Sequence, residues 1–230
     1  THTGENYEIK YIMGIMDYEE EVHESSWGIN GVFFPVDRNQ EFKQTSHEVQ
    51  FISDFDGPMN VVAGVYMMEA DSYITSGPAV QFTANHSVET TAVFGEINYD
   101  LSDVWSLTVG ARYTEEDKDL DSRSWVTGSS NVPRLSNSRD PSLLLNAGTP
   151  SFNDDNISYR VVLQREFELG MMYASYSTGF RSGGFFNRGS TDSELAPFKS
   201  EEVESFELGM RSNLTDHSQL KLAYFMHHIS

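Results

Sequence analysis

Regular alternation between polar and apolar residues is the feature of this sequence that most restricts its fold. In residues 171–181 the two alternating sets are mostly polar or small on one side and mostly apolar on the other: Tyr173, Ser175, Ser177, Gly179 and Arg181 against Met172, Ala174, Tyr176, Thr178 and Phe180. Successive side chains of a β-strand point to opposite faces, so this segment is predicted to be a strand with one wet and one apolar face. Residues 205–211 repeat the pattern.

The same period of two recurs along the whole chain. We expect about nine strands, at residues 7–18, 46–55, 60–69, 90–99, 105–114, 157–167, 171–181, 201–212 and 220–226. The predicted connections alternate in length: residues 56–59, 100–104, 168–170 and 213–218 are short, and residues 19–44, 70–87, 115–155 and 182–200 are long. In an antiparallel sheet this alternation places all short turns at one end and all long loops at the other, as in outer-membrane barrels.

Strand length and aromatic placement favour a sheet that crosses a membrane. Strands of about 9–11 residues span a bilayer, and residues 105–114 carry Trp105 and Tyr113 at the two ends of their apolar face. Membrane barrels have an aromatic girdle at each interface, whereas a soluble sandwich has no need of one. The chain has no run of about 18 apolar residues, which excludes membrane-spanning helices, and its start, THTGENYEIK, lacks the basic and apolar regions of a signal peptide. We therefore predict an all-β fold, an antiparallel transmembrane β-barrel segment with short periplasmic turns and long extracellular loops.

Composition excludes several kinds of function. The 230 residues include 35 acids and 15 bases, which gives a formal net charge of −20. This balance argues against nucleic-acid binding, because phosphate contacts need clustered Lys and Arg. The sequence has no cysteine, so it offers no disulfide framework, no Cys-based metal site and no Cys nucleophile.

Two motifs near the end of the chain resemble the TonB-dependent outer-membrane receptors. Barrels of that family carry a run like YxSxSxGFRSGGF followed by PExxxSYELGxKS, which corresponds here to residues 173–185 and 200–212. Ser200, Phe206 and Arg211 stand where the family usually has Pro, Tyr and Lys. Residues 46–66, 92–120 and 214–225 also look like the family, so the resemblance covers about half of the chain and most of the expected strands.

The resemblance implies a barrel of about 22 strands occluded by an N-terminal plug domain that carries an energy-coupling box. This sequence contains neither plug nor box, and we expect residues 1–230 to be a partial outer-membrane barrel domain, an internal fragment of a longer protein. The implied function is energised uptake of a scarce nutrient, most often a ferric siderophore, across the outer membrane of a Gram-negative bacterium. The implied partners are a small-molecule ligand such as a ferric chelate, outer-membrane lipid, and the TonB energy-coupling complex acting through the plug. The resemblance implies no cofactor and no enzymatic activity.

Charged residues on the polar faces of the expected strands are the candidate site residues. Those predicted to face the lumen are Glu96, Arg112, Arg160, Glu207 and Arg211. They either brace and hydrate the lumen wall or contact the plug and the passing solute. Arg181 and Arg188 lie near the predicted outer rim, where guanidinium groups suit an anionic ligand such as a ferric chelate.

Other residue groups do not form a catalytic or metal site by their spacing. Glu201 and Glu202 are neighbours in an expected strand and point apart, whereas a retaining glycosidase pair must converge to about 5–5.5 Å. His227 and His228 diverge for the same reason, with His217 across a turn. No G-x-S-x-G motif is present, and the Gly183-Gly184 pair is not followed by the helix or GK[ST] of a phosphate-binding loop.

Two other functions remain open at this point. The first is a passive porin-like channel, which is also a barrel but has neither plug nor energy coupling. The second is a soluble acidic β-sandwich that binds carbohydrate. A plug domain upstream in the full-length sequence would favour the receptor over the channel, and solubility of the full protein without detergent would favour the sandwich.

Overall fold

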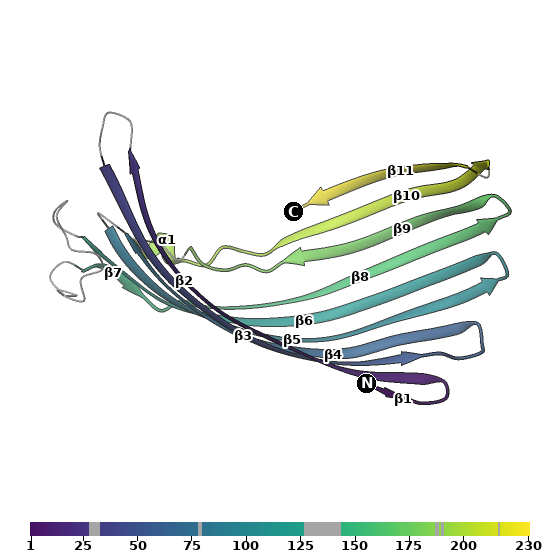
Figure 1. The fold of residues 1–230 in the computed structure, drawn as a ribbon, viewed down its shortest axis with the longest axis horizontal. Coiled ribbons are helices and arrows are strands. Elements are labelled where there is room, and N and C mark those ends of the chain that lie inside the picture. Colours follow the sequence, from purple (N-terminus) through teal and green to yellow (C-terminus); the bar gives the residue numbers. More distant parts are fainter. Residues whose placement is uncertain (28–32, 78–79, 127–143, 187–188, 190, 216) are drawn as a thin grey trace.

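The chain forms one large antiparallel sheet (Figure 1). The computed structural model describes residues 1–27, 33–77, 80–126, 144–186, 189, 191–215 and 217–230, without the side chains of residues 24–27, 33–37, 80 and 126. Within these residues the elements are β1 (His2–Thr3), β2 (Tyr7–Trp27), β3 (Phe33–Ser53), β4 (Met59–Gly77), β5 (Val80–Ser102), β6 (Trp105–Val126), β7 (Leu144–Gly148), β8 (Ser151–Phe167), β9 (Gly170–Arg181), α1 (Asp192–Leu195), β10 (Glu201–Thr215) and β11 (Ser218–Ile229).

Each long strand pairs with the next one along the chain. The order across the sheet is β1-β2-β3-β4-β5-β6-β8-β9-β10-β11, and the short β7 pairs with β6. In this chain the sheet is not closed into a barrel. β2, with the short β1 beside it, and β11 lie at opposite edges of the sheet and do not pair with each other (Figure 1). Apart from the two short strands β1 and β7, the nine strands of the described chain correspond to the nine predicted segments. The predicted fold class, an antiparallel all-β barrel segment, is confirmed.

The strands are much longer than predicted, and three of the four predicted long loops are wrong in extent. β2 and β3 occupy most of residues 19–44, and β4 and β5 occupy most of residues 70–87. Within residues 115–155, β6 continues to Val126 and β8 begins at Ser151, while residues 127–143 lie outside the described residues. These stretches have only a few scattered apolar residues among many polar and acidic ones, so they look like loops in the sequence. Strand pairing nevertheless continues through them, because the ladder is made by backbone groups and needs no apolar partner.

The four connections predicted to be short all lie at one end of the sheet (Figure 1). The strand ends next to the four predicted long loops lie at the other end. At the predicted turn around residues 56–58, Asn60 holds the chain: its Oδ1 accepts hydrogen bonds from the Ser53 hydroxyl and from the Phe55 amide, both at 2.8 Å. The Ser53 hydroxyl oxygen in turn accepts a bond from the Val61 amide at 2.7 Å. These bonds join the end of β3 to the start of β4.

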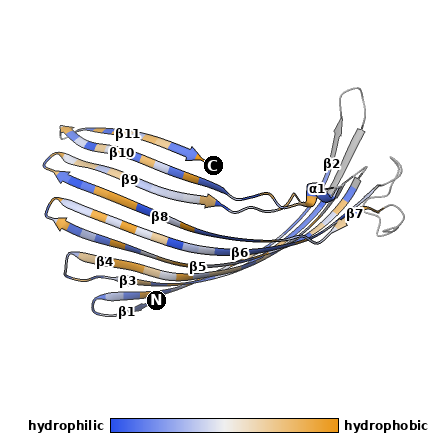
Figure 2. Cartoon of the chain, turned by 180° about the vertical axis from the view of Figure 1, so that it is seen from behind, coloured by the Kyte–Doolittle hydropathy of each residue, from blue (hydrophilic) through white to orange (hydrophobic). Residues whose placement is uncertain are grey.

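Near the short turns, hydrophilic and hydrophobic residues alternate along the strands (Figure 2). The register places the hydrophobic ones on one face, where they are exposed. Large side chains there are well exposed, for example Ile15 at 71%, Ile157 at 63% and Val93 at 53%. A contiguous apolar surface of this kind is rare on soluble monomers and marks contact with lipid or protein. We call this side of the sheet the apolar face and the opposite side the polar face.

Aromatic residues border this apolar surface at both levels. Tyr7, Phe51 and Trp105 lie toward the short turns, and the Tyr7 and Phe51 rings stack with centroids 5.9 Å apart. Tyr159 and Tyr176 lie further along the strands, with ring centroids 5.9 Å apart. The arrangement matches the two aromatic girdles of a membrane barrel.

The small buried core is at the other end of the sheet. Leu120 and Ala84, on the polar face, pack with Leu195 of α1, and Ile74 and Phe185 pack against them. No second sheet covers either face in the described part of the chain, so the architecture is not that of a β-sandwich. Helix is limited there to the four residues of α1, and none of it has the length or apolar character to cross a membrane.

Candidate functional site

The predicted lumen-facing residues share the polar face of the sheet. Glu96 and Arg160 come from β5 and β8, and both are in register with Gly110 of the intervening strand β6. The Arg160 guanidinium donates to the Glu96 carboxylate at 3.0 Å. Gly110 leaves room for this contact, because a Cβ there would lie 3.2 Å from Glu96 Oε2. The two charges therefore meet across a strand.

Arg112 contacts aromatic rings instead of an acid. Its guanidinium carbon lies 5.3 Å from the centroid of Tyr66 and 5.7 Å from that of Phe94. Its Nε also donates to the Thr114 hydroxyl at 3.0 Å. A side chain at Gly64 would collide with the Phe94 ring. Aromatic contacts of this kind hold a guanidinium in place without neutralising it, so Arg112 stays available to an anion.

Glu207 and Arg211 lie on β10. The Tyr173 hydroxyl on β9 donates to the Glu207 carboxylate, and the Tyr173 ring covers Gly209, where any Cβ would collide with it. Arg211 is exposed and has no ion-pair partner among the described residues. The structure brings Glu207 and Arg211 to one face but not into contact with Glu96, Arg112 or Arg160.

Of the two predicted rim arginines, the structure describes one. Arg181 is the last residue of β9, is exposed, and lies in register opposite Glu201 of β10. It forms no ion pair within the part of the chain that is described. Arg188 lies outside the described residues.

The connection after Arg181 folds back onto the polar face. We call residues 182–200 the shelf; residues 187, 188 and 190 of it are outside the described part of the chain. Lys118 of β6 is the main polar anchor: its ammonium donates to the Ser182 hydroxyl at 2.7 Å and to the Gly183 carbonyl at 2.8 Å. It also pairs with Glu116 at 2.9 Å. The Lys118 side chain is only 13% exposed, so these contacts are shielded from solvent.

The rest of the shelf is held by backbone bonds and apolar packing. Gly184 and Phe198 exchange backbone hydrogen bonds, and the Phe185 ring meets Phe152 edge-on at 6.5 Å. Leu195, 4% exposed, packs into the core described above. The Gly183 amide donates to the Asp154 carboxylate at 3.3 Å. The shelf thus crosses from β9 to strands β4, β5 and β6.

His86 lies under the shelf, with its ring 6.1 Å from that of Phe185. Burial lowers the pKa of His86 below its ordinary value, because the surroundings disfavour the charged imidazolium. The nearby Lys118 ammonium lowers the pKa further, and Asp119 acts in the opposite direction. His86 is therefore neutral beneath the shelf at neutral pH.

The sequence pattern does not indicate Lys118, Asp154 or His86 as site residues, because residues 70–87 and 115–155 have the composition of loops. The signal that could have found Lys118 is a continued period of two. In EEDKDLD, residues 115–121, the acids Glu115, Asp117, Asp119 and Asp121 fall on one phase, and Glu116, Lys118 and Leu120 fall on the other. The second phase is the one that meets the shelf.

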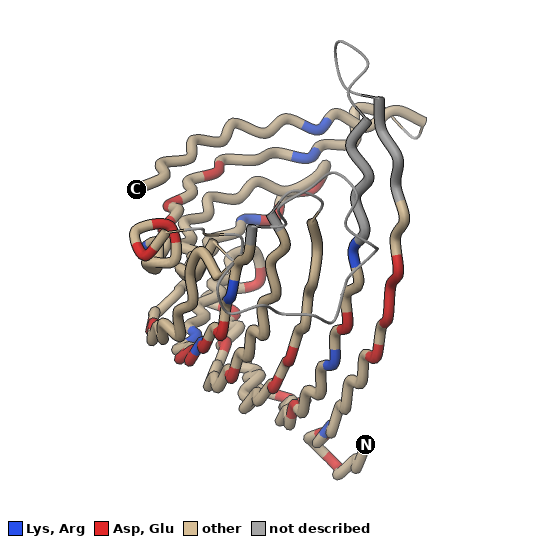
Figure 3. The backbone as a smooth tube through the Cα atoms, turned by 90° about the vertical axis from the view of Figure 1, so that its left-hand side faces the viewer, with Lys and Arg blue, Asp and Glu red and all other residues tan. Residues whose placement is uncertain are grey.

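The acids of the first phase belong to a surface on the other side of the sheet. Glu69, Glu89 and Asp117 lie directly opposite one another on β4, β5 and β6, and all three are exposed. Figure 3 shows acidic segments on neighbouring strands. This row lies beyond the apolar surface, on the same face, and consists of like charges in register.

The adjacent Glu and His pairs that resemble catalytic or metal-binding pairs in the sequence point to opposite faces of their strands, as expected. Glu201 and Glu202 are in register with Arg181 and Phe180 respectively, on opposite faces. His227 and His228 are likewise consecutive residues of β11. Among the described residues no three His, Asp or Glu side chains are grouped so as to hold a metal ion.

A family model decides the identity of this sheet. The model for the β-barrel of TonB-dependent receptor-like proteins matches residues 13–230. The chain belongs to the TonB-dependent receptor family. That family is a Gram-negative outer-membrane β-barrel family, and its members are transport receptors, not enzymes.

Solved structures agree with the TonB-dependent receptor fold. The ferric yersiniabactin uptake receptor FyuA from Yersinia pestis has a TM-score of 0.83 at 17% identity, over 99% of this chain and 34% of that one. The siderophore receptor PiuA from Acinetobacter baumannii gives 0.61 at 16%, over 96% and 38%. The ferric-catecholate import receptor Fiu from E. coli K12 gives 0.57 at 11%, over 99% and 44%. The chain therefore spans a third to less than half of the length of these receptors, and the likeness is one of fold.

Proposed function

We propose that the protein is an outer-membrane receptor that takes up a ferric siderophore by energised transport, and that residues 1–230 form part of its barrel wall. The observation that carries this proposal is the match of nearly the whole chain, at a TM-score of 0.83, to a ferric yersiniabactin uptake receptor. Two further neighbours are a siderophore receptor and a ferric-catecholate import receptor. The apolar face would contact outer-membrane lipid, and the polar face would line the transport path.

The energy for this transport would come from outside the described sheet. In the proposed mechanism a plug domain of the full-length receptor fills the barrel and passes force from the TonB energy-coupling complex. The sheet supplies the wall that the plug moves against. Arg112 and the Glu96–Arg160 pair give that wall fixed charges, and the shelf narrows the path near the extracellular end.

Growth on defined iron sources tests the proposal. A strain lacking the gene is grown under iron chelation with single ferric siderophores of catecholate and yersiniabactin-like chemistry as the iron source. We expect growth on at least one chelate to be lost, and to return with the full-length gene. Added inorganic iron should restore growth of every strain. Unchanged growth on all chelates, with loss of uptake of a different nutrient, would refute the siderophore assignment.

The passive-channel alternative predicts a different dependence on energy. A protonophore that collapses the inner-membrane proton gradient should stop uptake through a TonB-dependent receptor. Diffusion through a porin-like channel should continue under the same treatment. Uptake of radiolabelled chelate by the complemented strain, with and without protonophore, separates the two.

We also propose that Arg181, together with Arg188, helps to bind the anionic chelate. Arg181 is exposed at the end of β9, where the shelf begins. A hydrogen bond to a charged group is worth about 1.5–3 kcal/mol, so Arg181→Gln should weaken chelate binding by roughly tenfold or more. Arg123→Gln is the matched control, because Arg123 pairs with Asp121 at 3.1 Å on the opposite face. Equal affinities of the two variants for the chelate would show that Arg181 is not part of the binding site.

A further inference from the structure

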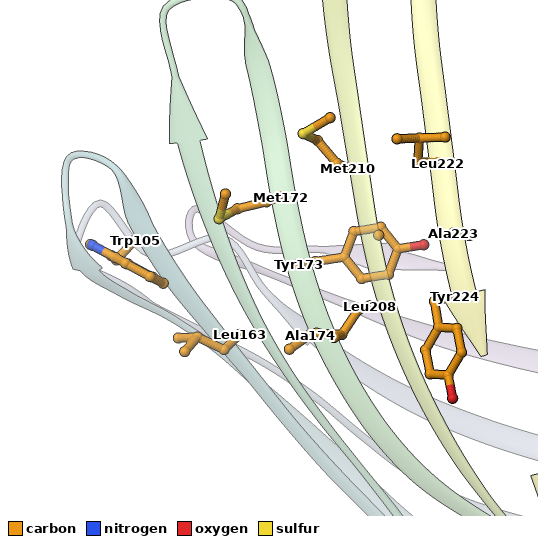
Figure 4. A pocket seen from close by; sticks show the side chains of 11 residues that line it. Trp105, Leu163, Met172, Tyr173, Ala174, Leu208, Met210, Leu222, Ala223 and Tyr224 are labelled. Carbon is orange, nitrogen blue, oxygen red and sulfur yellow. The ribbon is translucent and has the colours of Figure 1, made fainter. Parts of the chain in front are cut away.

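The apolar face contains a groove of about 450 Å³ near the short turns. Ala174 of β9 forms its floor, and larger side chains from neighbouring strands form its walls (Figure 4). The wall side chains are Trp105, Leu163, Met172, Leu208, Met210, Leu222 and Tyr224. The groove exists because a methyl group stands where the adjacent positions have long side chains.

The register of the sheet explains how these residues meet. Leu163, Ala174, Leu208 and Tyr224 occupy one row across β8, β9, β10 and β11. The next row toward the short turns consists of Trp105, Arg165, Met172, Met210 and Leu222. The side chains of both rows point to the apolar face, so the groove opens toward the bilayer and not toward the transport path.

One cation lies at the turn-side edge of the groove. Arg165 is exposed, lies between Trp105 and Met172 in the row nearest the short turns, and places its guanidinium carbon 5.4 Å from the Trp105 ring centroid. In the described part of the chain no carboxylate forms an ion pair with it. A guanidinium at the membrane interface can bind a phosphate with two parallel hydrogen bonds.

We propose that this groove and Arg165 together form a binding site for one phospholipid of the periplasmic leaflet. One acyl chain lies over Ala174, and the headgroup phosphate binds Arg165 beside Trp105. The apolar walls match the acyl chain, and the unpaired Arg165 at the turn-side end of the groove matches the phosphate. The groove is part of the apolar face, which is the face proposed to contact the bilayer. The inference rests on the membrane placement proposed above, but not on the identity of the transported ligand.

Native mass spectrometry of the full-length receptor, extracted in detergent and titrated with phosphatidylglycerol, tests the site. Arg165→Gln removes the phosphate partner and should weaken the first lipid-binding step about fivefold, the effect of one basic residue near a membrane surface. Ala174→Phe fills the groove with an outward-facing side chain and should weaken the same step by roughly threefold or more through lost packing. Ala174→Leu is a smaller filling and should have an intermediate effect.

Two controls make the same chemical changes elsewhere. Ala111 lies on the apolar face outside the groove walls, and Arg123 lies beyond the apolar surface. The variants Ala111→Phe and Arg123→Gln should both bind lipid like the wild type. Heat-modifiable migration in gels checks that every variant is folded. The site would be overturned if folded Ala174 and Arg165 variants bound phosphatidylglycerol like the wild type. Retention of lipopolysaccharide in the groove instead of phospholipid would also overturn it. A receptor dimer that Ala174→Phe abolishes would do the same, because it would show that a second copy covers the groove. Recovery of the receptor in the soluble fraction would overturn the membrane placement together with the site.

Discussion

Lys118 is the main polar anchor of the shelf. It joins β6 to Ser182 and Gly183 through two short hydrogen bonds, in a place largely shielded from solvent. Removing a buried charged donor leaves its acceptors unpaired, and that loss is larger than the loss of an exposed ion pair. A single side chain therefore connects the strand wall with the segment that lies over it.

Lys118→Met keeps the length of the side chain and removes the ammonium. We expect the free energy of opening the shelf to fall by about 1–3 kcal/mol, seen as faster hydrogen exchange at the paired amides of Gly184 and Phe198. Lys10→Met is the control, since Lys10 forms a more exposed pair with Glu8. Unchanged exchange in Lys118→Met would show that apolar packing alone holds the shelf.

We expect His86 to make the shelf sensitive to acid, because its ring lies under the shelf beside Phe185. Its folded-state pKa is lowered, so the unfolded or opened state binds a proton more readily below the ordinary value of 6.5. The stabilisation is complete above that value and decreases as the pH falls below it. We expect a cysteine placed at Leu195 to react faster with a thiol reagent as the pH is lowered from 7 to 5, after correction for thiolate fraction. His86→Gln should remove most of this pH dependence, and a profile identical to that of the parent would contradict the assignment.

At the scale of strands, the alternation in the sequence predicts where the strands lie but not how long they are. The alternation in residues 105–114 identifies the first half of β6 correctly, because one phase of that half is apolar, as in strands of membrane barrels. Beyond Tyr113 both faces are polar or covered by another segment, and acids that mark a loop in most proteins sit in a regular ladder instead. The sequence pattern therefore predicts too few strand residues beyond the apolar surface.

The site is predictable only in part for a similar reason. Alternation places Glu96, Arg112 and Arg160 on one face, which needs only local information. Their partners depend on register across β5, β6 and β8, which a single sequence does not encode locally. The contact of Lys118 with Ser182 joins residues far apart in the chain, and no periodicity could indicate it.

The row of Glu69, Glu89 and Asp117 should weaken the sheet at low ionic strength. Like charges directly opposite on neighbouring strands are unfavourable by roughly 0.2–1 kcal/mol per pair, and Glu89 takes part in two such pairs. We expect Glu89→Gln to raise the thermal unfolding midpoint of the full-length receptor at low salt. The gain should disappear at about 1 M salt, where the screening length is about 3 Å. Glu5→Gln, near the start of the chain, is the matched neutralisation, and an equal gain there would rule out a specific effect of the row.

For the whole molecule, the main constraint is closure of the sheet. At the two edges of the sheet formed by residues 1–230, one side of β2 and one side of β11 are largely unpaired in this chain. In lipid an unpaired backbone group costs several kcal/mol, so a spanning sheet must close. In a membrane, these strands would need further strands to close the sheet.

Expressed by itself, this chain should not insert as a monomer. We expect the isolated residues 1–230, refolded in detergent, to associate through their open edges, as shown by light scattering coupled to size-exclusion chromatography. The full-length receptor in the same detergent should elute as a single species with heat-modifiable migration. A monomeric, heat-modifiable isolated chain would contradict the requirement for closure.

The contacts that anchor the shelf come from one continuous part of the chain, between Ile74 and Phe198. A segment and all of its anchors are therefore encoded by a single stretch of gene. Recombination between related genes that exchanges this whole stretch keeps the shelf and its anchors together, and it carries the apolar-face residues of β5, β6, β8 and β9 with them. Receptors of this family with this arrangement can acquire a different shelf, together with the strands that hold it, in one inherited step.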